Sequence, residues 1–181
     1  MSVPELLPVL SEAEIQKRVT DLAREISADY RDEPLVLIGV LKGAFVFMAD
    51  LVRRLEIPVE IEFIRTSSYG KEDTSSGEVR LLHELGTDIR DKHALIVEDI
   101  LDTGLTIEKL VSCLAAYHPR SIRVCACIDK TERRINEFRA DYACFPVDEG
   151  FLVGYGLDYG EKYRYLPAIY AIKNSTSEDP K

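Results

Sequence analysis

Hydrophobic residues along this chain alternate between helical spacing and short continuous runs. Residues 11–14 (Ser-Glu-Ala-Glu) form a capping box, and apolar positions then recur every three or four residues as far as residue 26, which predicts a helix. A second helix is predicted from Gly43 onward and a third after Thr106, because each stretch has apolar residues on one face only. The three helices are therefore expected to cover an apolar layer.

The apolar runs between the helices predict strands. Residues 35–41 and 122–128 are nearly continuous apolar stretches, which is typical of strands that are buried on both faces. Residues 59–63 alternate Val, Ile and Phe with Glu, so this strand is predicted to be half exposed. Further strands are predicted at residues 79–82, 94–97, 142–145, 151–153 and 169–172. Strands that alternate with helices predict an α/β fold, with a mostly parallel sheet flanked by helices and with ligands beyond the carboxyl ends of the strands.

Two segments break this alternation. Residues 67–77 contain two glycines and no apolar periodicity, which predicts a mobile loop. Residues 174–181 are polar and are predicted to be a frayed tail. The rest has no repeat and no linker, and 181 residues is an ordinary length for one domain, so residues 1–173 are predicted to form a single domain.

Composition and charge narrow the classes of partner. The formal net charge is −9, which disfavours binding to nucleic acid or to an anionic membrane surface. No apolar run approaches the roughly 20 residues of a membrane span, and the first residues do not resemble a signal peptide, so the protein is expected in the cytoplasm. Reduced thiols are expected and zinc is not, since the cysteines form no Cys-x-x-Cys pair and the histidines are scattered (Cys113, Cys125, Cys127, Cys144, His83, His93 and His118).

Residues 95–107 carry the clearest chemical signal in the chain. An apolar run ends in Glu98 and Asp99, and Asp102 follows before a turn at residues 103–106 that contains two threonines and a glycine. A phosphate fits the start of the next helix, because its first N–H groups are free and carry a partial positive charge. The carboxylates suit ribose hydroxyls, a Mg²⁺ ion or both. The alternative is a helix cap and nothing more, which leaves two adjacent carboxylates at the end of a buried strand unexplained.

Residues 97–106, Val-Glu-Asp-Ile-Leu-Asp-Thr-Gly-Leu-Thr, resemble the 5-phosphoribosyl-1-pyrophosphate (PRPP) motif of type I phosphoribosyltransferases. Their wording is close to that of the hypoxanthine-guanine branch of that family. Other segments at residues 41–43, 67–70, 130 and 151–164 occur in the family order with compatible spacing, so the resemblance covers most of the chain. It implies the type I phosphoribosyltransferase fold, with a small hood subdomain built from N-terminal residues and residues from about 145 to 170.

The resemblance implies how PRPP is held. Glu98 and Asp99 bind the ribose hydroxyls and Mg²⁺, while Ser68 and Tyr69 belong to a flexible loop that closes over the pyrophosphate and excludes water. The 5′-phosphate is held by the turn after the motif strand (Thr103, Gly104, Leu105 and Thr106). The pyrophosphate is held by a loop whose Leu-Lys peptide bond can be cis and by a later arginine (Leu41, Lys42, Gly43 and Arg164).

The resemblance also implies how a purine is recognised. Phe151 stacks on the ring, the backbone of Leu152 reads its edge, and Lys130 donates to the 6-oxygen. Asp102 manages the proton of purine N7 as N9 attacks the ribose. Asp158 binds a second Mg²⁺, directly or through water. Two neighbouring arginines are expected to be surface or interface charges (Arg133 and Arg134).

The implied activity is purine salvage, in which hypoxanthine or guanine and PRPP give IMP or GMP and pyrophosphate. Mg²⁺ is the expected cofactor, and a homodimer or homotetramer is the expected assembly. A phosphoribosyltransferase for adenine, orotate, uracil or xanthine is an alternative. Lys130 and the segment at 151–159 argue against these substrates, and xanthine is the hardest of them to dismiss. A regulatory protein that keeps the fold and binds RNA or a repressor is disfavoured by the negative charge and by the presence of Asp102. A plain binding module would give no reason for a mobile loop beside three carboxylates.

Overall fold

A six-stranded sheet forms the centre of the molecule in the computed structural model, which describes residues 4–68, 79–81, 84–131, 134–136, 138–148 and 150–173. Its strand order is β4-β3-β2-β5-β6-β7, and every pair is parallel except the antiparallel pair β3 and β4. The strands are β2 (Leu35–Leu41), β3 (Glu60–Ser68), β4 (Val79–Leu81), β5 (His93–Leu101), β6 (Ser121–Lys130) and β7 (Tyr142–Val147). The predicted fold class is confirmed.

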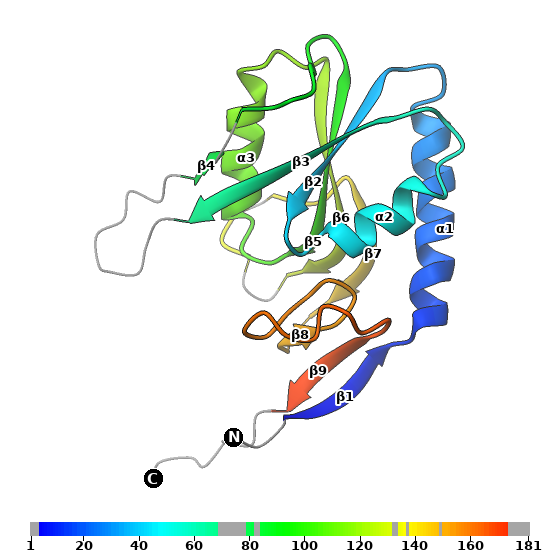
Figure 1. The fold of residues 1–181 in the computed structure, drawn as a ribbon, viewed down its shortest axis with the longest axis vertical. Coiled ribbons are helices and arrows are strands. Elements are labelled where there is room, and N and C mark those ends of the chain that lie inside the picture. The colour runs from blue at the N-terminus through cyan, green and yellow to red at the C-terminus, as the bar shows by residue number, and fades with distance from the viewer. Residues whose placement is uncertain are drawn as a thin grey trace.

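Helices cover both faces of this sheet (Figure 1). Helices α1 (Glu12–Asp29) and α2 (Phe45–Val52) pack on one face, and α3 (Leu105–Ala115) packs on the other. Neighbouring residues of the buried strands point to opposite faces, so that Leu37 joins the core under α1 and α2 whereas Ile38 joins the core under α3. The capping box that starts α1 is present, with Ser11 and Glu14 each bonded to the other's backbone.

A second, smaller sheet lies beyond the carboxyl ends of the parallel strands (Figure 1). It contains β1 (Glu5–Leu10), β9 (Ile169–Lys173) and β8 (Leu152–Val153) in the order β1-β9-β8, and both pairs are antiparallel. The strand β1 was not predicted, because it forms by pairing with β9, a partner that is distant in the sequence. We call this small sheet, with the turns between β8 and β9, the hood.

The half-exposed strand β3 differs from the simplest expectation. Its glutamates alternate with Ile61 and Phe63, yet these two apolar side chains are 44% and 37% exposed, because α2 is only eight residues long and leaves this edge uncovered.

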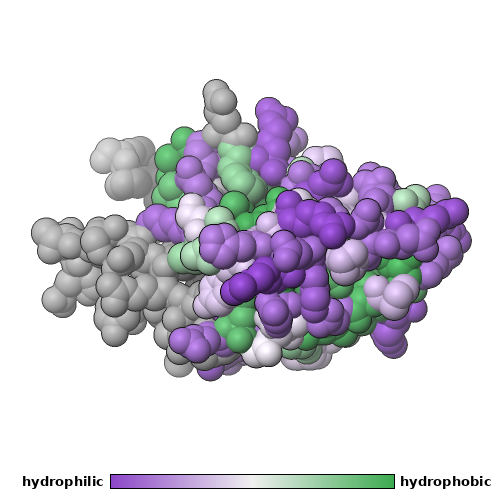
Figure 2. All heavy atoms as spheres, turned by 90° about the horizontal axis from the view of Figure 1, so that it is seen from above, coloured by the Kyte–Doolittle hydropathy of each residue, from purple (hydrophilic) through white to green (hydrophobic). Residues whose placement is uncertain are grey.

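At the end where the parallel strands begin, the surface is mainly hydrophilic (Figure 2). In the part of the chain that is described, no helix is long and apolar enough to cross a membrane.

Candidate active site

The acidic pair lies at the carboxyl end of β5. Glu98 and Asp99 belong to the strand, which continues to Leu101, whereas the sequence placed them after it. Glu98 Oε2 is buried without a hydrogen-bond partner among the described residues. Burial, followed by the charge of Asp99, raises the pKa of Glu98 well above its usual range, and burial also raises the pKa of Asp99. Two carboxylates in this setting favour a cation or hydroxyl donors beside them.

The loop after β2 lies directly against this pair. Its Leu41–Lys42 peptide bond is cis, as the resemblance implied. A Cβ atom on Gly43 would lie 1.8 Å from Asp99 Oδ2, so glycine is required for the loop to approach the carboxylate this closely. The structure therefore brings residues 41–43 and the acidic pair into contact.

A turn of the hood reaches the same place. A Cβ atom on Gly156 would lie 2.1 Å from the carbonyl oxygen of Gly43, and Gly156 has a φ of +99° that favours glycine. The turn is held by its own backbone, since Gly156 N–H donates to the Arg164 carbonyl at 3.0 Å. Three segments that are far apart in the sequence thus meet at the carboxyl ends of β2 and β5.

Two cationic side chains belong to this junction. Arg164 donates to the Gly156 carbonyl at 2.7 Å and pairs with Asp158 at 2.6 Å, while its Nε is buried without a hydrogen-bond partner within the described ranges. Lys42 Nζ lies 2.7 Å from Glu161 Oε2, and this hydrogen bond lowers the pKa of Glu161. Both cations are therefore held by carboxylates of the hood turn.

The turn after β5 leads into α3 through Gly104, which precedes the helix with a φ of +82°. The Thr103 hydroxyl accepts from the N–H of Leu105, the first residue of the helix, at 3.4 Å. Capping by Thr103 accounts for one residue and leaves the two adjacent carboxylates of β5 unexplained. The start of α3, which includes Leu105 and Thr106, offers N–H donors and a partial positive charge that suit a phosphate.

The residues that were expected to contact a base lie where β6 meets the hood. Lys130 ends β6, is only 7% exposed, and donates to the Gly150 carbonyl at 3.0 Å. Phe151 is 51% exposed, and its ring meets the edge of Tyr159 at a centroid distance of 5.5 Å. Leu152 follows in β8 and is buried. Phe151 is thus not a core residue and Lys130 is not a solvated surface lysine.

Part of the expected lid cannot be placed. Ser68 ends β3, where its backbone pairs with Val79 of β4. Tyr69 and residues 70–78 lie outside the described residues, so the lid stays a prediction.

Sequence reasoning misjudged one residue near this site and missed the contact of another. Arg134 was predicted to be a surface or interface charge, and this is wrong, since its side chain is 10% exposed and bonds to the ends of β5 and β6. Its neighbour Arg133 lies outside the described residues. Tyr155 of the hood turn donates its hydroxyl to the largely buried Asp50 of α2 at 2.8 Å. Neither contact has a signal in the local sequence pattern.

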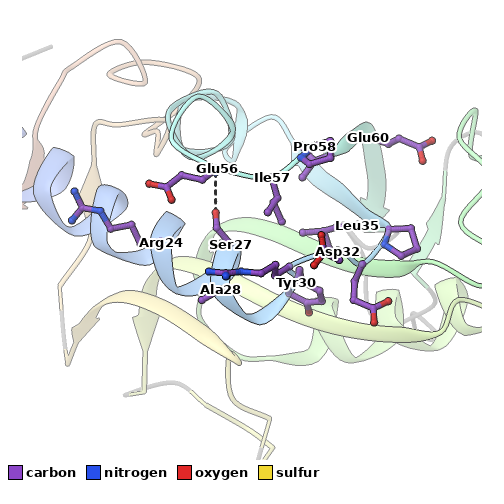
Figure 3. Close-up of a pocket in the computed structure, with 14 residues that line it drawn as sticks. Arg24, Ser27, Ala28, Tyr30, Asp32, Leu35, Glu56, Ile57, Pro58 and Glu60 are labelled. Atoms are coloured by element: carbon purple, nitrogen blue, oxygen red, sulfur yellow. Dashed lines mark hydrogen bonds between the residues drawn. The ribbon is translucent and has the colours of Figure 1, made fainter.

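A separate cavity of about 770 Å³ lies at the opposite end of the sheet (Figure 3). It is formed between the last turns of α1 and the segment that precedes β3. Its lining carries charges of both signs (Arg24, Arg31, Asp32, Glu33, Glu56 and Glu60). None of the expected site residues lines it, so the candidate site is the junction at the carboxyl ends.

Comparisons with known proteins point to one family. The model of the phosphoribosyl transferase domain matches residues 9–160. The hypoxanthine-guanine phosphoribosyltransferase of Aquifex aeolicus is 46% identical over 92% of this chain and 94% of its own length, and that of Bacillus subtilis is 42% identical over 94% of both. A solved hypoxanthine-guanine phosphoribosyltransferase from Bacillus anthracis superposes with a TM-score of 0.88 at 40% identity, covering 93% of this chain and all of the other.

The family model spans most of the chain, and the relatives are matched over nearly their whole length. The fold, the cis peptide after β2 and the acidic pair of β5 are features that the sequence resemblance implied. This chain belongs to the phosphoribosyltransferase family.

Proposed function

We propose that this protein transfers the 5-phosphoribosyl group of PRPP to hypoxanthine or guanine, forming IMP or GMP and releasing pyrophosphate in purine salvage. The observation that carries this proposal is the junction of Asp99, Gly43 and Gly156, where three segments meet closely enough to exclude any side chain at the two glycines. The ribose, the pyrophosphate and the base would then bind at neighbouring positions around this junction. Catalysis would then come mainly from positioning and electrostatics.

The acidic pair fits a Mg²⁺ ion that is shared with the substrate. Glu98 Oε2 is buried without a partner among the described residues, and hard carboxylate oxygens are the ligands that Mg²⁺ prefers. In the described part of the chain no group of three or more His, Cys, Asp or Glu side chains could hold a metal alone. This supports an ion that takes its other ligands from ribose hydroxyls, pyrophosphate and water. When bound, Mg²⁺ would neutralise charge on the leaving pyrophosphate.

The hood carboxylate Asp158 is proposed to reach a second Mg²⁺ through water. One of its oxygens pairs with Arg164, and the other accepts from the Glu161 N–H at 2.8 Å. Both oxygens are thus engaged within the turn, which favours an indirect contact. The buried Arg164 Nε would donate to a pyrophosphate oxygen together with the backbone N–H groups of Lys42 and Gly43.

The remaining residues around the junction have these proposed roles. The 5′-phosphate would sit at the start of α3 (Thr103, Gly104, Leu105 and Thr106), and Ser68 and Tyr69 would close over the pyrophosphate. Glu98 and Asp99 would hold the ribose hydroxyls, and their charge would favour the developing cationic ribose. Asp102 would then hold the proton at purine N7 while N9 attacks C1′.

The base would stack on Phe151 and present its 6-oxygen to Lys130. An ammonium group donates hydrogen bonds and accepts none, so a 6-oxo purine pairs with it and the 6-amino group of adenine does not. The half-exposed ring of Phe151 and the buried amine of Lys130 support this arrangement. Leu152 would read the base edge through its backbone.

At the level of the whole chain, we propose a single domain over residues 1–173 with the hood as its subdomain, and a polar tail at 174–181. The free cysteines fit a reducing cytoplasm. A homodimer or homotetramer is proposed, and the exposed apolar residues Phe45, Ile61 and Phe63 suit a contact between copies. Ile61 and Phe63 lie on the same face of β3, next to β2.

One assay tests the proposal. The protein is incubated with PRPP, Mg²⁺ and one base at a time (hypoxanthine, guanine, xanthine, adenine, orotate or uracil), and nucleotide formation is followed. Hypoxanthine or guanine should be used and adenine rejected, with at least a tenfold difference in kcat/KM because a buried donor left unpaired costs about 1–3 kcal/mol. A preference for adenine or a pyrimidine would contradict the base assignment, and no PRPP-dependent product with any base would contradict the function.

A further inference from the structure

Arg134 lies across the ends of the two strands that carry the proposed chemistry. Strands β5 and β6 run side by side as far as the pair Leu101 and Asp129. Asp102 follows the first strand, and Lys130 ends the second. The guanidinium of Arg134 occupies the point where the two chains separate, and its side chain is only 10% exposed.

The contacts of this guanidinium reach both strand ends. Nε donates to the carbonyl of Asp102 at 2.9 Å, and Nη2 donates to the carbonyl of Leu101 at 3.1 Å. On the other side, Nη2 donates to the carbonyl of Lys130 at 3.0 Å and pairs with the carboxylate of Asp129. One side chain therefore holds the backbone of the proton-handling residue and the backbone of the base-binding lysine.

The residues that follow Arg134 contact the turn between β5 and α3. Ile135 N–H donates to the Thr103 carbonyl at 3.2 Å. The side-chain amide of Asn136 donates to Glu108 of α3 at 2.7 Å. Asn136 Oδ1 lies so close to Gly104 that a Cβ atom on this glycine would be only 2.3 Å from it. These contacts of Ile135 and Asn136 hold the turn at residues 103–106, which we call the phosphate turn. The guanidinium of Arg134 is therefore not needed to hold this turn, and its contacts with the two strand ends call for another explanation.

We propose that Arg134 is a positioning residue that fixes Asp102 relative to Lys130, and hence sets the proton-handling carboxylate against the bound purine. This role rests on the proposed function. Arg134 touches neither PRPP nor the base in this arrangement, and it acts through the two backbones that it joins.

The arrangement requires an arginine. A guanidinium carries five N–H donors in a planar fork, which can serve acceptors on two chains at once. A lysine has three donors on one nitrogen and cannot span the same set of acceptors. Arg134→Lys therefore keeps the charge and removes the bridge.

The test is steady-state kinetics with hypoxanthine and PRPP for four proteins: wild type, Arg134→Lys, Asp102→Asn and the double variant. We expect Arg134→Lys to lower kcat by about ten- to a hundredfold, the size of loss that a small misplacement of a catalytic group causes. The KM for PRPP should change little, because residues 135 and 136 still hold the phosphate turn. A purely structural role would lower the amount of active protein and leave kcat per folded molecule unchanged, with active sites counted by titration.

The double variant decides whether Arg134 acts through Asp102. Its kcat should be no lower than that of Asp102→Asn alone, because a carboxylate that is already disabled cannot be misplaced further. Losses that multiply would overturn the proposal. The control variant is Arg139→Lys. Arg139 is exposed, and it lines the same cavity as Arg134, which has a volume of about 460 Å³. The kcat of this control should equal that of wild type.

The outcomes separate the two claims. An inactive wild type would overturn the proposed function and this role with it, whereas an active wild type with unchanged kcat in Arg134→Lys would overturn only the role of Arg134. If Arg134→Lys does not fold, Asp129→Asn replaces it, because it weakens one side of the bridge and keeps the guanidinium. This variant should also lower kcat, by a smaller factor and without adding to Asp102→Asn, and an unchanged kcat would refute the proposal.

Discussion

Asp102 stands at the turn between the acidic pair and the start of α3. We expect Asp102→Asn to keep the fold and PRPP binding but to lower kcat by about 10²–10⁴-fold, the usual contribution of a general acid or base. Steady-state kinetics and calorimetric titration with Mg-PRPP measure the two effects separately. Wild-type turnover in a folded Asp102→Asn protein would show that the proton is handled elsewhere.

The acidic pair should cost stability in exchange for substrate binding. Burial raises the folded-state pKa of both Glu98 and Asp99, so their favourable contribution exists below the unfolded values of about 4 and is lost as pH rises through the folded values. The double variant Glu98→Gln/Asp99→Asn should therefore melt higher than wild type at pH 7 to 8, by about 2–4 °C for each kcal/mol by which the cost of buried charge and the repulsion are relieved. The gain should vanish near pH 4.

The same variant should bind Mg-PRPP more weakly in a calorimetric titration, because it lacks the proposed ligands. Exposed Glu56, changed to Gln, is the matched control, since it should alter neither the melting temperature nor the affinity. A gain in melting temperature that is the same at every pH would refute the electrostatic explanation. Unchanged affinity would mean that the pair is only a feature of the strand end.

At the scale of elements, Asp50 of α2 ties the hood turn to the core. It accepts from the side chains of Gln16 at 2.9 Å and Tyr155 at 2.8 Å, and it pairs with Arg53. Burial pushes the pKa of Asp50 up, but these hydrogen bonds outweigh it and hold the pKa below its usual range. The stabilisation is thus present above the unfolded pKa of about 3.9 and is lost as pH falls through the lower folded value.

Tyr155→Phe should test this connection. It removes one donor to a buried carboxylate, so we expect a loss of about 1–3 kcal/mol at neutral pH and a smaller loss below pH 4. Because Gly156 of the same turn lies against Gly43, the KM for PRPP should also rise. Exposed Tyr165, changed to Phe, is the control. Equal melting curves of the Tyr155→Phe and control proteins at neutral pH would exclude a role for this contact.

The elements were predictable to the extent that their patterns are local. Within the described residues, the three helices and eight of the nine strands follow from apolar spacing and the capping box. Strand β5 was placed correctly but ended too early, because Glu98 and Asp99 interrupt its apolar run. Strand β1 escaped because pairing with β9, a partner at the far end of the chain, makes it a strand. The contacts of Arg134 and Tyr155 were hidden for the same reason, since a single sequence does not show which distant residues meet.

At the scale of the whole molecule, the exposed apolar residues of β3 predict self-association. Ile61→Lys places a charge beside exposed Phe63 on the same face of the strand and should lower the molar mass found by sedimentation or light scattering. Leu7→Lys is a matched control, because Leu7 is a similarly exposed apolar residue on the hood. Equal masses for wild type and Ile61→Lys would mean that copies meet through another face.

The pairing of β1 with β9 has a consequence for the order of assembly during synthesis. Among the described strands β1 comes first in the chain and β9 comes last, yet they pair from Glu5 with Lys173 onward. The strands of the central sheet are closer together in sequence and can pair while the chain is still growing, whereas β1 has no partner until β9 has been made. A nascent chain could therefore form the central sheet first, and the hood, which we propose to help bind the base, would form only after β9 has been made.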